Sequence, residues 1–390
     1  MIVYADNAAT TKPSPRALEA LVEVAGTFYG NPSSIHTPGQ KAKEVLEAAR
    51  ASIARSIGAD PREVTFTSGG TEADNHALRS AARLGAKKGK MHLVSSTIEH
   101  HAILHTLEAL KSEGFEVTLV PVDGAGLVDP QDVKRVIRPD TALVSIMYAN
   151  NEIGTIEPVK EIAAICREAG VLFHTDAVQA VGHLDLDVHE LGIDMLSFSG
   201  HKFHGPRGVG ALYVRKGVRL LPFIEGGAQE RGLRAGTDNL PAIHAMAAAL
   251  EESLEGRAEK MATVAALRDR LISGLLSIPR TYLNGDPDKR LPGNVSICFE
   301  GIEGESLLLM LDSRGIAASS GSACTSGSLD PSHVLLAIGR PHEIAHGSLR
   351  LTLDVENTIE EAEYILDTLP GIVEYLRGIS PVWEKLEQTA

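Results

Sequence analysis

The segment Met195–Pro206, MLSFSGHKFHGP, decides the fold class and points to a chemistry. Its apolar start predicts a buried strand, and the loop that follows places Lys202 between two histidines, ahead of a Gly-Pro turn. A lysine at the mouth of a strand can be desolvated and aimed at a carbonyl carbon, which a covalent amine catalyst requires. A solvated loop lysine beside chance histidines is the alternative that this segment alone leaves open.

The same alternation of a short apolar strand and an amphipathic helix recurs through the first part of the chain. The expected strands are Val64–Thr67, His92–Ser96, Phe115–Val122, Ala142–Met147, Val171–Thr175, Asp194–Phe198 and Gly210–Val214. The expected helices between them include Ala42–Ile57, Glu72–Leu84, His101–Glu113 and Val159–Ala169. This alternation predicts an α/β fold with a mostly parallel sheet and helices on both faces.

After about residue 240 the pattern changes, which predicts a second, smaller α/β domain. A long helical stretch, Pro241–Leu276, leads into the apolar segments Val295–Phe299, Glu305–Leu311 and Leu349–Leu353 and a final helix, Thr358–Arg377. We therefore expect a large domain over residues 15–255. The smaller domain would combine residues 1–14 and 256–390 and include a mobile loop over 317–328, which is rich in small residues.

Composition excludes several classes of function. The chain has 390 residues and a formal net charge of −14, which disfavours direct nucleic-acid binding and attachment to an anionic membrane surface. No apolar run is long enough for a spanning helix, and the first residues lack the pattern of a signal peptide. Three cysteines cannot form a disulfide framework, so we expect a reducing, cytoplasmic location.

Two further motifs at predicted strand ends suit a phosphorylated aromatic cofactor. The stretch Thr67–Glu72, TSGGTE, opens an expected helix, and its glycines and first amides predict a phosphate cradle. Asp176 precedes Lys202 by one strand–helix unit and would pair with a protonated pyridine nitrogen. A plain turn with Thr71 as N-cap and an N-cap role for Asp176 stay open as alternatives.

Three more residues are candidates for chemistry. Asn151 follows an expected strand and would donate to a phenolic oxygen or a carboxylate, whereas His100 would stack on a flat ring or move a proton. Cys324 lies in the stretch 319–328, SSGSACTSGS, and a thiol in an exposed, mobile loop suits transfer between two sites. The plainer alternatives are a turn asparagine, a solvent-facing histidine and an incidental surface cysteine.

Taken together, the motifs closely resemble one family. They are SFSGHKFHGPRGVG, HTDAVQ, TSGGTEADN, IEHHA, NNEIG, RAGT and SSGSACTSG, and they extend almost from end to end of the chain. This set resembles the cysteine desulfurases of the NifS/IscS type, in the group with the longer cysteine loop. Those enzymes belong to the class V aminotransferases among the fold-type-I pyridoxal phosphate enzymes. The resemblance therefore implies a fold-type-I architecture, pyridoxal 5′-phosphate as cofactor and a homodimer.

The resemblance also implies a role for each matching residue. Lys202 would be the Schiff-base lysine and the base at the substrate Cα, His100 an acid or base, and Cys324 the persulfide carrier. The cofactor-binding residues would be Gly70, Thr71, His100, Asn151, Asp176, Gln179, Ser199, His201, Lys202 and, from the neighbouring subunit, Thr237. Arg350 would hold the substrate carboxylate in a forked contact, with Asn151 beside it. No metal site is expected, because HExxH and paired-cysteine spacings are missing.

The implied reaction converts L-cysteine to L-alanine. Lys202 would remove the Cα proton, the Cys324 thiolate would attack the substrate sulfur, and the persulfide would pass to an acceptor such as an iron–sulfur scaffold or a thiolation protein. The alternatives are another class V enzyme (an aminotransferase or a selenocysteine lyase), a metalloenzyme and a non-catalytic scaffold. An aminotransferase has no use for Cys324, and decay to a scaffold fits poorly with an intact Lys202, Asp176 and Arg350.

Overall fold

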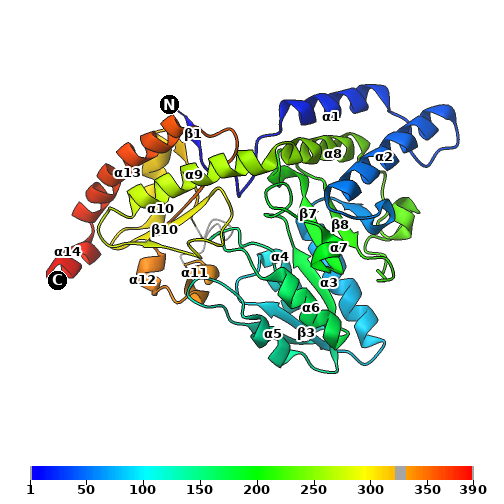
Figure 1. Cartoon of the computed structure of the whole chain (residues 1–390), viewed down its shortest axis with the longest axis horizontal. Coiled ribbons are helices and arrows are strands. Elements are labelled where there is room, and N and C mark those ends of the chain that lie inside the picture. The colour runs from blue at the N-terminus through cyan, green and yellow to red at the C-terminus, as the bar shows by residue number, and fades with distance from the viewer. Residues whose placement is uncertain (1, 321–330, 389–390) are drawn as a thin grey trace.

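A seven-stranded sheet lies at the centre of the structure, a computed structural model that describes residues 2–320 and 331–388 (Figure 1). Its strands are β2 (Val64–Thr67), β3 (His92–Ser96), β4 (Glu116–Val120), β5 (Thr141–Ser145), β6 (Leu172–Asp176), β7 (Met195–Ser199) and β8 (Gly210–Val214). They are arranged in the order β2-β8-β7-β6-β5-β3-β4. Only β8 runs antiparallel to its neighbours, which confirms the predicted mostly parallel sheet.

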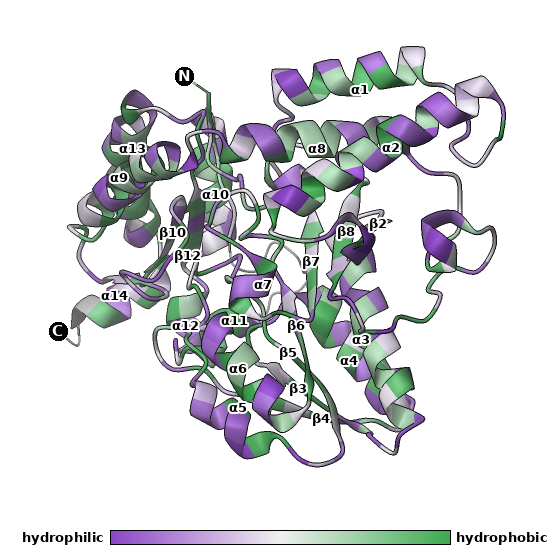
Figure 2. Cartoon of the chain, turned by 45° about the vertical axis from the view of Figure 1, so that its right-hand side comes forward, coloured by the Kyte–Doolittle hydropathy of each residue, from purple (hydrophilic) through white to green (hydrophobic). Residues whose placement is uncertain are grey.

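Helices cover both faces of this sheet. They are α1 (Pro15–Thr27), α2 (Thr37–Ser56), α3 (Gly70–Ala86), α4 (His101–Ser112), α5 (Pro130–Val136), α6 (Val159–Ala169), α7 (Val188–Leu191) and α8 (Leu240–Leu254). Successive strand residues point to opposite faces, so Leu143 packs in the core cluster that includes α3 and α4, and Val144 packs in the one that includes α2, α6 and α8. Figure 2 shows green, hydrophobic strands between helices that carry purple, hydrophilic residues.

The C-terminal part builds a separate, three-stranded antiparallel sheet in the order β12-β10-β9. Its elements are α9 (Arg257–Leu275), β9 (Thr281–Leu283), β10 (Asn294–Phe299), α10 (Gly304–Ser313), β11 (Ile316–Ala317), α11 (His333–Ala337), α12 (His342–Ala345), β12 (Ser348–Thr352), α13 (Ile359–Gly378) and α14 (Pro381–Gln388). The first strand, β1 (Val3–Tyr4), pairs with β11, so the N-terminus lies with the C-terminal elements (Figure 1). Val3 accordingly belongs to the same core cluster as Leu271 and Ile365.

The structure divides one helical stretch that the sequence pattern joins. The helical stretch expected over Pro241–Leu276 is two helices, because the chain turns at Glu255 and Gly256, whose φ of 62° is left-handed. The apolar segment Glu305–Leu311 lies within helix α10. Among the described residues, no helix combines the length and the apolarity needed to cross a membrane.

Candidate active site

Two neighbouring parallel strands end side by side and carry the first site residues. Asp176 is the last residue of β6 and Ser199 the last of β7. Lys202 follows directly, in the short helical turn η2 (Gly200–Lys202). Because β6 and β7 are paired in parallel, their carboxyl ends meet at one edge, which is where open α/β sheets bind ligands.

The N-terminal segment crosses this edge and meets the lysine. The Lys202 Nζ donates hydrogen bonds to the carbonyl oxygens of Ala8 at 2.6 Å and Ala9 at 2.8 Å. Gln179 Nε2 donates to the same Ala8 oxygen at 3.0 Å, and the Thr11 amide donates to the His201 carbonyl oxygen at 2.9 Å. The site is thus built from both the central sheet and the first residues of the chain, and local sequence patterns gave no sign of this contact.

Asp176 is a buried carboxyl group between two basic side chains. Burial raises its pKa, whereas the charges of His100 and Lys202 and a hydrogen bond from the Val178 amide act in the opposite direction. A buried carboxylate that faces basic groups is an environment that would hold a protonated ring nitrogen.

His100 is the N-cap residue of helix α4, and its ring interacts electrostatically with Asp176. Its Nδ1 accepts a hydrogen bond from the Ala102 amide at 3.1 Å, which leaves Nε2 as the protonated nitrogen of a neutral ring. Burial lowers the pKa of His100, and the nearby Asp176 opposes that shift. A neutral ring at this position suits both stacking and proton transfer.

The expected phosphate cradle is a helix start at which glycine lets the backbone approach the neighbouring loop closely. A Cβ added at Gly70 would lie 2.6 Å from Val178 Cγ2, and one at Gly69 would lie 3.6 Å from Ser199 Oγ. No side chain caps the first turn of α3, so its first amides are not bound by a capping group. Thr71 is exposed at this turn.

His201 lies beside the lysine with its ring held by a hydroxyl group. Its Nδ1 is 3.1 Å from the Thr10 Oγ1. Burial and the charges of Lys202 and Arg207 lower the pKa of His201 to about 4, so its ring is neutral at physiological pH. A neutral imidazole in this place can donate one hydrogen bond to an anion.

Arg350 reaches the site from the C-terminal sheet. It lies in β12, where its Nη1 donates to the Asn151 carbonyl oxygen at 3.1 Å and its Nη2 to Asp6 Oδ1 at 3.0 Å. Its Nε is buried and has no hydrogen-bond partner among the described residues. The adjacent Asn150 is a structural residue, since its Oδ1 accepts from the amides of Glu152 and Ile153.

The predictions for two further residues are not tested by the single chain. Thr237 is exposed in the single chain, and Cys324 lies outside the described residues, so the predictions for both residues stay untested. The other two cysteines, Cys166 and Cys298, are buried. For Cys166 this agrees with its position on one helical face with Val159 and Ile162.

Sequence patterns missed a set of buried polar groups behind Asp176. His174 Nδ1 lies 2.8 Å from Ser145 Oγ, and its Nε2 lies 3.0 Å from Ser197 Oγ and 3.7 Å from Asp74 Oδ1. Burial and the charge of Asp176 raise the pKa of Asp74 well above its usual value, and burial lowers that of His174 to about 3. Asp74 looks in the sequence like any polar residue of a surface helix, so only the packing of α3 on the sheet reveals it.

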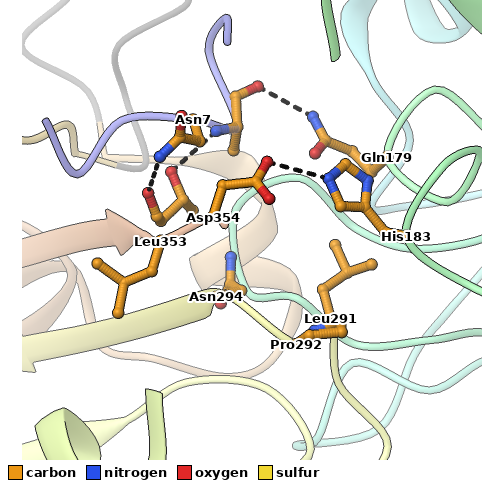
Figure 3. A pocket seen from close by; sticks show the side chains of 11 residues that line it. Asn7, Gln179, His183, Leu291, Pro292, Asn294, Leu353 and Asp354 are labelled. Atoms are coloured by element: carbon orange, nitrogen blue, oxygen red, sulfur yellow. Dashed lines mark hydrogen bonds and ion pairs between the residues drawn. The ribbon is translucent and has the colours of Figure 1, made fainter. Parts of the chain in front are cut away.

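A pocket opens beside Gln179, which is one of the residues that line it (Figure 3). It is an open pocket of about 370 Å³, a volume that includes solvent space, and its lining comes from the N-terminal segment, the loop after β6 and the C-terminal sheet. Its lining includes Asn7, Gln179, His183, Asn294 and Asp354, but not the lysine of the cluster.

A lysine and a buried carboxylate at adjacent parallel strand ends, beside a glycine-rich helix start, define a fold-type-I enzyme of the kind that uses pyridoxal phosphate. The Aminotransferase class-V family model matches residues 3–365. The chain belongs to this family and, within it, to the cysteine desulfurases of the IscS and NifS type.

Individual relatives show how close the similarity is. The chain is 53% identical over 387 residues to the cysteine desulfurase IscS of Methanosarcina thermophila, with 99% of this chain and 96% of that relative covered. A solved NifS-like protein superposes with a TM-score of 0.91 at 40% identity, covering 96% of this chain and all (100%) of that one. A solved structure described as SspA in complex with cysteine superposes with a TM-score of 0.81 at 36% identity. The match covers 91% of this chain and 100% of that one.

Proposed function

We propose that this chain is a pyridoxal phosphate-dependent cysteine desulfurase, which converts L-cysteine to L-alanine and keeps the sulfur on Cys324. One observation carries the proposal. Asp176 and Lys202 lie at one edge of the central sheet, and the N-terminal segment that crosses this edge contacts both Lys202 and Arg350. The relatives named as cysteine desulfurases align over nearly the whole of this chain.

The residues present fit the cofactor that this family uses. Lys202 offers the amine, Asp176 a buried negative charge for the ring nitrogen, and the uncapped start of α3 at Gly70 a place for the phosphate. When bound, pyridoxal phosphate supplies a ring that accepts the electron pair left at the substrate Cα. His100, Asn151, Gln179, Ser199 and His201 would complete its surroundings, with Thr71 at the start of α3.

Lys202 and Arg350 divide the handling of the substrate. The two carbonyl contacts of the Lys202 Nζ hold the amine at the sheet edge, from where it takes the proton from Cα and returns one to the product. The substrate carboxylate would replace Asp6 Oδ1 as the partner of Arg350, whose unpaired Nε offers a second donor for a forked contact.

Cys324 receives the sulfur. Its thiolate attacks the substrate sulfur, the bond between that sulfur and the substrate Cβ breaks, and the electron pair stays on Cβ, which then takes up a proton. The products are alanine and a persulfide on Cys324, so no external oxidant or reductant is needed. We further propose a homodimer in which Thr237 reaches the neighbouring site, and a cytoplasmic sulfur acceptor such as an iron–sulfur scaffold or a thiolation protein.

The proposal is tested by replacing Cys324 with alanine and supplying L-cysteine together with dithiothreitol. The wild-type chain should release sulfide and alanine in equal amounts. The Cys324→Ala variant should still bind the cofactor, which is seen as visible absorbance, but release sulfide at a rate near background. Sulfide release by the variant at most of the wild-type rate would overturn the role of Cys324.

A further inference from the structure

The loop that carries Lys202 is tied to the C-terminal sheet by one buried carboxylate. Asp354 lies two residues after strand β12 and is 3% exposed. Its Oδ2 is 3.2 Å from His204 Nε2 and 3.3 Å from His183 Nε2. Figure 3 shows the second of these contacts at the edge of the pocket. Both histidines belong to the part of the chain that builds the central sheet, so the carboxylate links the two sheets.

The ring of His204 has an acceptor at each nitrogen. Its Nδ1 lies 3.0 Å from the Lys12 carbonyl oxygen, and its Nε2 lies within ion-pair distance of Asp354 but outside hydrogen-bond geometry. A neutral imidazole carries one proton, so it cannot donate to both partners, whereas an imidazolium can. Burial lowers the pKa of His204, but the carboxylate of Asp354 and the Lys12 carbonyl raise it by more, which leaves it above the usual histidine value.

The remaining charges around this ring favour the cation. The titratable or charged side chains that line the same cavity are His183, Glu252, Lys260, Asp354 and Glu356. Three of these are acids, and Glu356 also pairs with the Lys12 Nζ at 3.7 Å. The backbone of His204 has a φ of 62°, which is uncommon for a residue with a side chain. Such a conformation persists only where the surrounding contacts fix it.

We propose that His204 and Asp354 form an ionic latch that positions Lys202 relative to Arg350. Lys202 and His204 are two residues apart in one turn, and Arg350 and Asp354 are four residues apart at the end of one strand. Closing the pair therefore fixes the amine that moves the Cα proton against the guanidinium that holds the substrate carboxylate. The latch rests on the proposed function, and its value to catalysis is orientation of groups already present.

The kinetic test compares Asp354→Asn with His183→Asn. Both changes remove a contact of the same carboxylate oxygen, but only the first releases the loop of Lys202. For Asp354→Asn we expect kcat for alanine formation to fall by about tenfold to a hundredfold, because small displacements of reacting groups are costly. The KM for L-cysteine and the visible absorbance of the bound cofactor should change little. The control His183→Asn should keep kcat within about twofold of the wild type, since it leaves that loop in place.

The pH profile separates positioning from general damage. In the wild type the latch is closed below the raised pKa of His204 and opens as the pH rises through it, so kcat should fall there. In Asp354→Asn the ion pair is missing at every pH, so this fall should disappear, whereas in His183→Asn it should stay. An Asp354→Asn variant with wild-type kcat and an unshifted profile would overturn the latch. If Asp354→Asn fails to fold, His204→Asn takes its place, because asparagine tolerates the left-handed backbone at this position. This variant should show the same loss of kcat, and its kcat should not fall at high pH.

A measurement without substrate distinguishes the latch from the desulfurase reaction. His204→Asn, Asp354→Asn and the double variant are compared in urea unfolding at pH 6.5. If the two residues are coupled, the double variant should be destabilised by less than the sum of the single changes. Strictly additive losses would overturn the latch, whatever the activity. A wild-type chain that forms no alanine would overturn the proposed function, while coupling in unfolding would still establish the ion pair.

Discussion

The guanidinium of Arg350 has a defined orientation in the site, because it donates hydrogen bonds to two groups at once. One arm reaches the Asn151 carbonyl and the other reaches Asp6, so the side chain is already oriented before a carboxylate arrives. Lysine has a single flexible ammonium group and cannot reproduce a forked contact. The residue is therefore held for its geometry as well as its charge.

We predict that Arg350→Lys raises the KM for L-cysteine by about one to two orders of magnitude. The estimate follows from the loss of one hydrogen bond to a charged group, about 1.5–3 kcal/mol. Arg340→Lys is the matched control, since Arg340 bonds Asn284 and the Leu283 carbonyl and touches none of the proposed site residues. Steady-state kinetics at saturating cofactor measure both, and an unchanged KM in Arg350→Lys would remove this residue from substrate binding.

At the scale of single residues, strand ends were predictable and distant side-chain pairs were not. Asp176, Ser199 and Lys202 could be placed together because the carboxyl ends of parallel strands meet at one edge. The contact of Asp354 with His204 joins positions 150 residues apart, and no local pattern encodes it.

At the scale of elements, helix α3 and the loop after β6 approach each other so closely that one position requires glycine. We predict that Gly70→Ala lowers the free energy of unfolding by about 1–3 kcal/mol, a typical cost of overpacking. The added Cβ would press on Val178, two residues beyond Asp176, so the affinity for pyridoxal phosphate should also fall.

Gly371→Ala is the matched control for this prediction. Gly371 lies inside helix α13, and a Cβ there would meet nothing within 4 Å. Alanine should therefore be neutral or stabilise the chain by about 0.5–1 kcal/mol. Urea unfolding and cofactor titration measure both variants, and a Gly70→Ala chain as stable and as tightly loaded as the wild type would contradict the close approach.

The elements themselves were predicted well wherever the pattern was strongly periodic. Strands β2, β3 and β8 and helix α6 have the predicted limits. The break between α8 and α9 was missed because Glu255 and Gly256 interrupt a pattern that is helical on both sides. The short helix α5 and the C-terminal helix α14 were missed as well, since about two turns of helix give little periodicity.

At the scale of the whole molecule, stability depends on buried carboxyl groups in the part of the chain that the structure describes. Burial raises the pKa of Glu99 to about 8, of Glu152 to about 7 and of Glu157 to about 8. Such a group keeps its proton in the folded chain where the unfolded chain has lost it, above a pKa of about 4.3. The folded state then binds more protons, so these groups make stability fall as the pH rises from about 4.3 towards 8.

We predict that Glu157→Gln reduces this loss of stability between pH 5.5 and 8. The amide oxygen can still accept the hydrogen bond from the Val128 amide, and no charge has to be buried at high pH. Urea midpoints at the two pH values give the measurement, with the exposed Glu168→Gln as the control that should follow the wild type. An equal loss of stability in Glu157→Gln and the wild type would contradict the buried, protonated state.

The domain division at residues 14/15 and 255/256 stays a prediction that the packing supports. The C-terminal sheet, helix α13 and the first strand share a core cluster, and the helices on the central sheet contribute to others. The return of the N-terminal segment to the site could be expected only from the family resemblance, because it depends on contacts with the whole assembled chain.

The central claim is that Lys202 and a bound cofactor act on L-cysteine, and an absorbance spectrum with product analysis tests it most directly. The purified protein is loaded with pyridoxal phosphate, scanned before and after L-cysteine is added, and assayed for alanine. We predict a visible band that shifts on addition, with alanine accumulating over many turnovers, and neither change in Lys202→Ala. A protein that stays colourless after loading, or one whose band shifts without alanine forming, would contradict the account.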